Sequence, residues 1–347
     1  MKRFKWILCL CALFLLGGCE NISSGEHETI HVYNWGEYLD TDTLRMFEEE
    51  TGIHVIYDTF ASNEDLYVKL KKSNDPYDVV VPSEYMVERL IREDMLRPLD
   101  YDLIPNSQKM DKRILDMEYD PGNRYSLPYY WGTLGIVANK KYVDTPIDSW
   151  KDLWDPHYKN EIIMYNSQRD SIAVALKMLG YSMNSRSEKE LEEAGKALIE
   201  QKPLIYAYLA DEGRDVMSQG DAALSVMYSG DATMMCQENK DLEYIIPKEG
   251  SNIWYDSFVV PKDAKNPTGA MKFINFMSRP DIAAINAEFN VGYATPVLEA
   301  IDLLPKELRE NTIAYPDVDR LPPLEVYRDA GDLVKVYDRI WTEVTAK

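Results

Sequence analysis

The sequence predicts an α/β protein with two lobes, each built on a mainly parallel sheet with helices on its faces. The first observation is the alternation of strand and helix signals over residues 29–96, which is typical of a doubly wound sheet. The second is the return of this alternation from about residue 135, without an internal repeat. The third is that no long Pro- or Gly-rich linker separates two halves, so we expect several strands to cross between the lobes.

Three strands, each followed by a helix, are predicted in the first lobe. The strands cover residues 29–35, 53–60 and 77–81, and the last of them is apolar enough to be buried on both faces. The helices are expected over residues 42–50, from 63 onward and over 84–96. Gly52 is a typical end for the first helix, and the Ser62 to Asp65 capping box opens the second.

The second lobe is predicted from residue 135 onward. Strands are expected over 161–165 and 222–228, and helices over 170–179 and 187–200. A strand at 257–261, a turn at 263–267 and an amphipathic helix at 269–277 follow.

Residues 1–18 are predicted to form a signal peptide. Three basic residues precede an uncharged, mostly apolar run from Trp6 to Gly18, which is too short to span a bilayer. The run ends in Leu16-Gly17-Gly18-Cys19, which looks like the lipobox of bacterial lipoproteins, so we expect lipid on Cys19 and a flexible tether over 19–27. The alternative is an ordinary leader with an unmodified cysteine.

The composition is acidic and rich in polar-tipped rings. With 38 Lys plus Arg against 59 Asp plus Glu, the formal net charge is -21, which argues against nucleic acid as a partner. Of the four cysteines only Cys236 follows Cys19, so no intramolecular disulfide is expected. The 24 Tyr and 7 Trp exceed the 8 Phe, a preference that suits wet binding surfaces for cationic or sugar ligands.

Motifs for catalysis are largely missing. The sequence contains no G-x-G-x-x-G, P-loop, G-x-S-x-G or H-E-x-x-H pattern, and its four histidines do not form a metal-binding motif. We therefore expect neither a cofactor nor a metal. Paired carboxylates are too common in this composition to indicate a glycosidase.

Rings and carboxylates recur together where strands are expected to end. The clusters are Asn34-Trp35-Gly36-Glu37-Tyr38, Ser83-Glu84-Tyr85, Trp254-Tyr255-Asp256 and Gly292-Tyr293. An aromatic face attracts an ammonium group, and a neighbouring carboxylate accepts a charge-assisted hydrogen bond from it. An aliphatic polyamine needs this combination, although a single ring at a strand end is more often there for packing.

Eight motifs occur in order between about residues 30 and 345. They are Tyr33-Asn34-Trp35-Gly36-Glu37-Tyr38, Thr51-Gly52-Ile53, Ser62-Asn63-Glu64, Tyr77-Asp78-Val79-Val80-Val81-Pro82-Ser83, Tyr129-Tyr130-Trp131-Gly132, Ser149-Trp150-Lys151-Asp152-Leu153-Trp154, Pro247-Lys248-Glu249-Gly250 and Gly292-Tyr293-Ala294-Thr295-Pro296. Together they resemble the spermidine/putrescine-binding proteins of bacterial polyamine ABC importers. The resemblance implies a two-lobed periplasmic-binding-protein fold of type II, which closes on its ligand by a hinge and docks on a membrane permease.

The resemblance also assigns roles to individual residues. Asp256 takes the place of the principal ammonium-binding carboxylate, Asp170 that of a second acid, and Ser83 that of the family's serine. The aromatic walls map onto Trp35, Tyr38, Tyr85, Trp254 and Tyr293.

Departures from the family pattern leave the preference between spermidine and putrescine open. Ser167 stands where spermidine-binding members tend to have a carboxylate, Tyr228 replaces a Trp, and Tyr327 replaces a Gln. Glu37 and Asp211 are candidates to compensate for the missing charge. These five residues are the weaker members of the predicted polyamine site.

The sequence thus predicts a lipid-anchored, monomeric, non-enzymatic protein that binds polyamines outside the cytoplasmic membrane and passes them to an ABC permease. The first lobe is expected to comprise 28–134 with 257–300, and the second 135–256 with 301–347. The alternatives are a binding protein for a sugar or another small cation and, more remotely, a secreted glycan-active enzyme.

Overall fold

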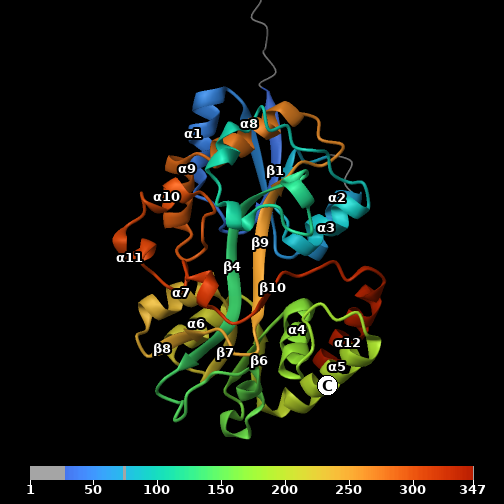
Figure 1. Ribbon diagram of the computed structural model, residues 1–347, viewed down its shortest axis with the longest axis vertical. Coiled ribbons are helices and arrows are strands. Elements are labelled where there is room, and N and C mark those ends of the chain that lie inside the picture. Colours follow the sequence, from blue (N-terminus) through green and yellow to red (C-terminus); the bar gives the residue numbers. More distant parts are fainter. Residues whose placement is uncertain (1–27, 73–75, 347) are drawn as a thin grey trace, which may run out of the picture.

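The computed structural model describes residues 28–72 and 76–346, which form two α/β lobes, one above the other in Figure 1. The predicted signal peptide, Cys19 and the tether lie outside the described residues. Two long strands, β4 (Ser126–Asn139) and β9 (Ser251–Val259), run through the middle of the molecule and belong to both lobes (Figure 1). This is the crossing expected from the absence of a linker.

The first lobe contains the N-terminal strands and the helices around them. Its other strands are β1 (Thr29–Trp35), β2 (His54–Phe60) and β3 (Val79–Val80). Its helices are α1 (Thr41–Thr51), α2 (Asn63–Lys72), α3 (Glu84–Arg92), α8 (Pro267–Met277), α9 (Pro280–Phe289), α10 (Leu298–Ile301) and α11 (Lys306–Arg309).

The second lobe is built on four further strands. They are β5 (Ile162–Tyr165), β6 (Ile205–Leu209), β7 (Leu224–Tyr228) and β8 (Leu242–Ile245), and the short β10 (Leu324–Glu325) pairs with β9. The helices are α4 (Gln168–Met178), α5 (Glu188–Gln201), α6 (Glu212–Gln219), α7 (Ser229–Glu238) and α12 (Val334–Ala346).

Two predicted helix boundaries in the first lobe, the end of α1 and the start of α2, are confirmed. Gly52 caps α1 with a left-handed φ of 71°, a conformation that costs glycine little. At the start of α2, the backbone N–H of Asp65 donates to Ser62 Oγ at 3.1 Å. Both signals are local, which is why the sequence alone was enough to place them.

Several predicted boundaries were wrong. The strand expected over 77–81 is only Val79–Val80, and α3 ends at Arg92 rather than 96, before Asp94 with φ 56°. The strand expected over 257–261 is the last part of β9, and β4 was not predicted at all. Every residue of both strands is buried, so neither has the alternation of polar and apolar residues that marks a half-exposed strand.

One continuous path of pairing links the two lobes. The strand order is β2-β1-β3-β9-β4-β7-β5-β6, with β8 paired to β4. Strand β4 pairs antiparallel with β9 over Ser126–Thr133 and then with β7 over Leu134–Ala138. The first half of β4 therefore belongs to the sheet of the first lobe, and its second half belongs to the sheet of the second lobe.

The C-terminal segment returns to the second lobe later than predicted. Leu304, Leu308 and Ala314 are buried in the first-lobe core, although the predicted limit at residue 301 puts them in the second lobe. The chain enters the second-lobe core at Tyr327 and then covers it with α12, through residues such as Ile340. The short helix α10 packs beside α9, and Leu308 of α11 is buried in the same core, which explains the difference. The other lobe limits stay a prediction.

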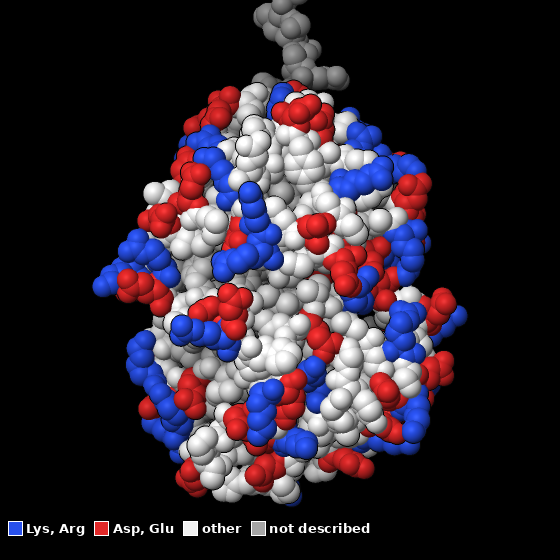
Figure 2. Space-filling view, viewed as in Figure 1, with Lys and Arg blue, Asp and Glu red and all other residues white. Residues whose placement is uncertain are grey.

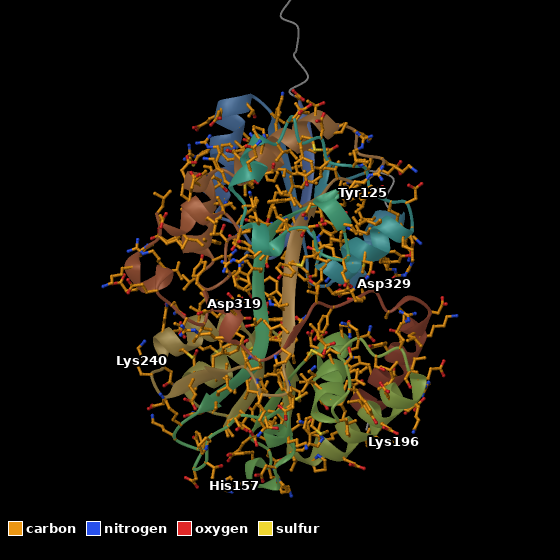
Figure 3. The ribbon with its side chains drawn as sticks, viewed as in Figure 1. Tyr125, His157, Lys196, Lys240, Asp319 and Asp329 are labelled. Carbon is orange, nitrogen blue, oxygen red and sulfur yellow. The ribbon has the colours of Figure 1, made fainter. Side chains whose placement is uncertain are left out.

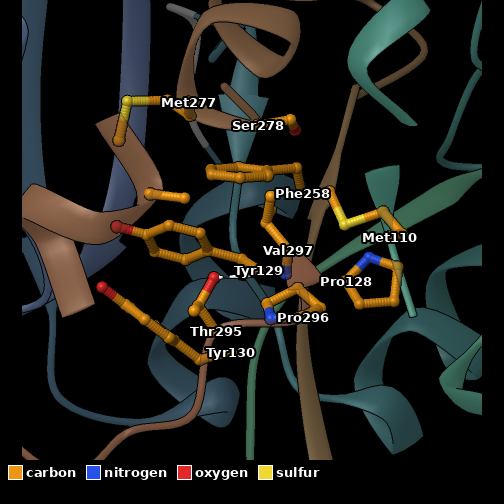
Figure 4. A pocket seen from close by; sticks show the side chains of 11 residues that line it. Met110, Pro128, Tyr129, Tyr130, Phe258, Met277, Ser278, Thr295, Pro296 and Val297 are labelled. Atoms are coloured by element: carbon orange, nitrogen blue, oxygen red, sulfur yellow. Dashed lines mark hydrogen bonds between the residues drawn. The ribbon is translucent and has the colours of Figure 1, made fainter. Parts of the chain in front are cut away.

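The first-lobe core is tightly filled. A cavity of about 10 Å³ lies between Tyr129, Phe258 and Met277, at most the room of a single water molecule (Figure 4).

The outer surface carries both acidic and basic side chains (Figure 2). Acidic and basic side chains are interspersed on the face shown in Figure 2, so the net negative charge does not form one block there. Within 28–72 and 76–346, no helix combines the length and the apolar character needed to cross a membrane.

Candidate functional site

A cavity of about 710 Å³ is enclosed by residues of both lobes. Its wall comes from the turn after β1, the N-termini of α2, α3, α4 and α6, and the middle of β9. All thirteen predicted site residues line it, namely Trp35, Glu37, Tyr38, Ser83, Tyr85, Ser167, Asp170, Asp211, Tyr228, Trp254, Asp256, Tyr293 and Tyr327. The structure therefore brings together every residue selected from the sequence, from segments up to 292 positions apart.

One wall of the cavity is a continuous series of aromatic rings that passes from the first lobe to the second. Each ring lies edge-on or tilted against the next, the geometry that aromatic pairs favour. The distances between ring centroids are 6.4 Å for Trp35–Tyr38, 5.4 Å for Tyr38–Tyr293, 5.7 Å for Tyr293–Trp254, 5.9 Å for Trp254–Tyr228 and 4.9 Å for Tyr228–Tyr165.

Asp256 is a deeply buried carboxylate, with 5% of its surface exposed. Its Oδ2 accepts a hydrogen bond from the Tyr38 hydroxyl at 2.5 Å, and its Oδ1 accepts one from Ser83 Oγ at 2.6 Å. Asn63 in turn donates to Ser83 Oγ at 3.1 Å. Burial raises the pKa of Asp256 to about 6, against the effect of the two hydroxyl donors.

The sequence suggested that Trp254 and Asp256 lie at a strand end. The structure shows otherwise. They lie in the middle of β9, where the strand passes from one lobe to the other. Their side chains reach the cavity because the cavity lies at this crossing.

Asp170 occupies the first turn of α4 on the second-lobe side. Ser167 caps this helix, since its Oγ accepts from the Asp170 backbone N–H at 3.4 Å. Tyr327 donates its hydroxyl proton to Asp170 Oδ1 at 3.2 Å. Burial raises the pKa of Asp170, while hydrogen bonds from Ser167 and Tyr228 oppose the shift. Ser167 and Tyr327, two of the five weaker candidates, thus both contact the predicted residue Asp170.

Glu37 and Asp211 line the cavity at a different part of its wall. Glu37 has a φ of 51° in the turn after β1, and Asp211 immediately precedes α6. Loss of hydration raises the pKa of Asp211. The nearby Arg214 lowers this pKa, whereas the negative charges of Glu212 and Glu37 raise it further. A cation at this end would meet several carboxylates.

Tyr85, the remaining predicted ring, reaches across the boundary between the lobes. It packs against the core of each lobe, and its hydroxyl donates to Glu64 Oε1 at 3.3 Å.

Sequence reasoning missed several residues of the wall, among them Glu64, Glu84, Tyr165, Arg169 and Trp341. Tyr165 ends a predicted strand, so the rule applied to Trp35 would have found it. Glu84 is the carboxylate of the Ser83-Glu84-Tyr85 cluster but was not assigned to the site, and Arg169 adjoins Asp170 without a motif of its own. Trp341 lies on α12 and packs against the second-lobe core, and no motif around it marks it as a cavity residue.

The comparisons with known proteins agree with this geometry. Residues 43–315 match the family model described as "Bacterial extracellular solute-binding protein". The chain is 38% identical over 345 residues to a spermidine/putrescine-binding periplasmic protein of Salmonella typhimurium, with 99% of both chains covered. It is 32% identical over 363 residues to the putrescine-binding periplasmic protein PotF of Escherichia coli, covering 98% of this chain and 97% of that protein.

A solved structure confirms the predicted fold class. The chain matches a putative spermidine/putrescine ABC transporter protein from Listeria monocytogenes with a TM-score of 0.87 and 44% identity, over 92% of this chain and 99% of that one. These relatives are substrate-binding transport proteins and not enzymes. A family model that spans most of the chain and full-length relatives lead to one conclusion: the chain belongs to the bacterial extracellular solute-binding proteins.

Proposed function

We propose that this protein binds spermidine or putrescine outside the cytoplasmic membrane and delivers it to the permease of an ABC importer. The observation that carries the proposal is Asp256, a buried carboxylate beside a wall of rings that, among the described residues, accepts side-chain hydrogen bonds from two hydroxyls. The names of the full-length relatives support the same ligand class.

The site offers a polyamine what its chemistry requires. An ammonium group at Asp256 would form a charge-assisted hydrogen bond and would remove the charge imbalance of the buried acid. The methylene groups would lie along the rings from Tyr38 to Tyr228, where cation–π contacts add about 0.5 to 2 kcal/mol for each nitrogen they reach. Asp170, or the pair of Glu37 and Asp211, would hold a further nitrogen. A neutral sugar would leave Asp256 without a counter-charge, and the comparisons do not support a sugar carrier or a glycan-active enzyme.

Removal of the Asp256 charge tests the function. We expect Asp256→Asn to weaken putrescine and spermidine binding by about 30- to 3000-fold, because loss of one partner of a desolvated charge pair typically costs about 2 to 5 kcal/mol. Titration calorimetry on a soluble form without residues 1–19 measures the affinity for putrescine, spermidine, spermine and a neutral oligosaccharide. Asp42→Asn removes the same charge from an exposed position of α1 and should leave affinity unchanged. Equal affinities of the two variants for polyamines, or binding of the oligosaccharide alone, would contradict the proposal.

We also propose that lipid on Cys19 anchors the protein, with residues 1–18 as its signal peptide and a monomer as its functional form. The support is the sequence Leu16-Gly17-Gly18-Cys19. Cells that produce Cys19→Ala should release the protein into the soluble fraction, whereas the unchanged protein should sediment with membranes. A Cys236→Ala variant controls for the loss of a thiol. Full membrane retention of Cys19→Ala would exclude the anchor.

A further inference from the structure

Glu84 is a second acid beside Asp256 that the proposed function does not use. It is the first residue of α3, it borders the cavity, and 0% of its surface is exposed. A carboxyl group this deeply buried needs a structural or functional reason, because an unpaired charge in the protein interior is strongly unfavourable.

Two reciprocal hydrogen bonds hold Glu84 and Asp256 next to each other. Ser83 and Asp256 face each other as an antiparallel bridge, and Ser83 Oγ donates to Asp256 Oδ1 at 2.6 Å. In the opposite direction, the backbone N–H of Tyr255 donates to Glu84 Oε2 at 2.9 Å. Each carboxyl is therefore anchored by the residue that precedes the other one, and neither can move away without breaking a hydrogen bond.

The second oxygen of Glu84, Oε1, is buried and has no hydrogen-bond partner among the described residues. One cation faces the carboxyl, the Arg169 guanidinium on α4. Its Nη1 donates to Met183 O at 2.8 Å and its Nη2 to Asn184 Oδ1 at 2.6 Å, while its Nε has no hydrogen-bond partner among the described residues. The charged and titratable groups that face Glu84 from the surrounding elements are Asp256 and Tyr255 of β9, Arg169 of α4, Tyr85 of α3, Tyr119 before β4 and Tyr327 after β10.

This environment favours the neutral acid while the cavity holds no cation. Burial raises the pKa of Glu84 to about 8, and the Asp256 charge adds to the shift against the lowering by backbone hydrogen bonds and Arg169. A cation beside Asp256 changes the balance, because it stabilises negative charge on both carboxyls.

We propose that Glu84 is a positioning residue that couples the capture of a cationic ligand at Asp256 to the release of one proton. The O–H bond of Glu84 breaks when the ammonium group arrives, the electron pair stays on the carboxylate, and the proton passes to solvent. The second negative charge then holds the ammonium group and Asp256 together. This inference rests on the proposed function, since it needs a cationic ligand in the cavity.

Coupling to a proton makes affinity depend on pH in a stated direction. Binding of the cationic ligand favours the ionised form of Glu84. The affinity for that ligand therefore rises with pH until Glu84 is already ionised in the empty protein, near pH 8. Putrescine is the appropriate probe, because alkyl amines like that of Lys titrate near pH 10.4 and stay charged from pH 6 to 8.

Calorimetry in two buffers of different ionisation enthalpy counts the protons. At pH 7 we expect about 0.5 to 1 proton to leave per putrescine bound by the unchanged protein, from a carboxyl that is mostly protonated when empty. The Glu84→Gln side chain keeps the shape of Glu84 but carries no acidic proton. This variant should release fewer than about 0.2 protons per putrescine bound, and its affinity should depend less on pH. Glu49→Gln, at an exposed position of α1, is the control for the exchange of a carboxyl for an amide elsewhere in the protein.

The same proton release from the Glu84→Gln variant and the unchanged protein would overturn the inference. If Glu84→Gln does not fold, infrared difference spectroscopy of the unchanged protein decides, because the band of a protonated carboxyl must disappear when putrescine is added. Persistence of that band excludes the coupling. Absence of both putrescine and spermidine binding by the unchanged protein would instead refute the proposed function, so the two failures are distinguishable.

Discussion

At the scale of single residues, the character of the site follows from how Asp256 is held. Within the described chain its oxygens accept hydrogen bonds from the hydroxyl groups of two side chains. Many other acids are paired with a basic side chain instead, as Asp281 is with Arg279. Hydroxyl donors stabilise the carboxylate without neutralising it. The charge of Asp256 therefore stays available for a ligand.

The Tyr38 hydroxyl should tune this carboxylate. Tyr38→Phe keeps the ring but removes a donor that lowers the pKa of Asp256, so more of this acid will be protonated near pH 7. We expect putrescine affinity to fall by about tenfold or more at pH 6, since a hydrogen bond to a charged group contributes about 1.5 to 3 kcal/mol. The deficit should shrink at pH 8, where the acid is ionised in both proteins. Tyr67→Phe, whose hydroxyl donates to Glu93 away from the cavity, is the control. Equal deficits at both pH values would contradict this explanation.

Part of the site could be predicted from single residues, and part could not. Trp35 and Tyr38 follow a predicted strand, where α/β proteins place their ligands. Asp256 belongs to a cluster of rings and carboxylates in the sequence, but only the resemblance to a family singled it out as the principal carboxylate. Glu84 was missed because its burial depends on β9, whose Tyr255 is 171 positions away along the chain.

At the scale of elements, the two crossing strands decide where the cavity lies. Both β4 and β9 are buried along their whole length, so local patterning could not distinguish them from other apolar segments. The helix caps at Gly52 and Ser62 could be predicted because each is a contact between neighbours in sequence. Long-range pairing thus limits sequence reasoning more than local geometry does.

The N-terminus of α7 approaches the ring wall so closely that only glycine fits. A Cβ at Gly230 would lie 2.6 Å from Cδ2 of Tyr293, whose hydroxyl also donates to Asp231 of the same helix at 3.3 Å. Gly230→Ala should displace the Tyr293 ring, cost about 1 to 3 kcal/mol of folding stability and weaken polyamine binding at least tenfold. Thermal unfolding and calorimetry measure the two effects.

A matched overpacking variant separates stability from binding. Gly195→Ala would place its Cβ 2.8 Å from Ile340 Cγ2 in the second-lobe core, away from the cavity. It should destabilise the fold similarly and bind polyamines normally. If Gly230→Ala binds as tightly as Gly195→Ala, the position of the Tyr293 ring is not important for the ligand.

At the scale of the whole molecule, an ion-pair network joins the lobes outside the cavity. Arg328 contacts Glu88 of α3 at 2.6 Å and Glu118 at 2.6 Å, while its backbone N–H donates to Asn184 of the second lobe at 2.9 Å. The next residue, Asp329, lies at the level between the lobes in Figure 3 and pairs with Arg92 of α3. This network fixes the orientation of α3 relative to the second lobe.

Loss of the network should remove contacts that hold the two lobes together around the cavity. We expect Arg328→Ala to lower polyamine affinity about fivefold, because a partly exposed bidentate pair contributes on the order of 1 kcal/mol. Added salt should reduce the difference between the variant and the unchanged protein. Arg279→Ala breaks an ion pair with Glu50 and Asp281 inside the first lobe and should not change affinity. Calorimetry at low and high ionic strength tests both, and an unchanged affinity of Arg328→Ala would show that the network does not contribute to polyamine binding.

The position of β9 between β3 and β4 also constrains how the chain can fold. A ribosome that has completed β4 at Asn139 has made most of the first-lobe sheet, yet the strand that joins β3 to β4 begins only at Ser251. The first lobe cannot mature as an independent unit during synthesis, because its central strand is among the last to be made. High contact order of this kind slows folding. The sheet of the first lobe therefore cannot be completed until residue 259 of 347 has been made, so an early intermediate would lack its central strand.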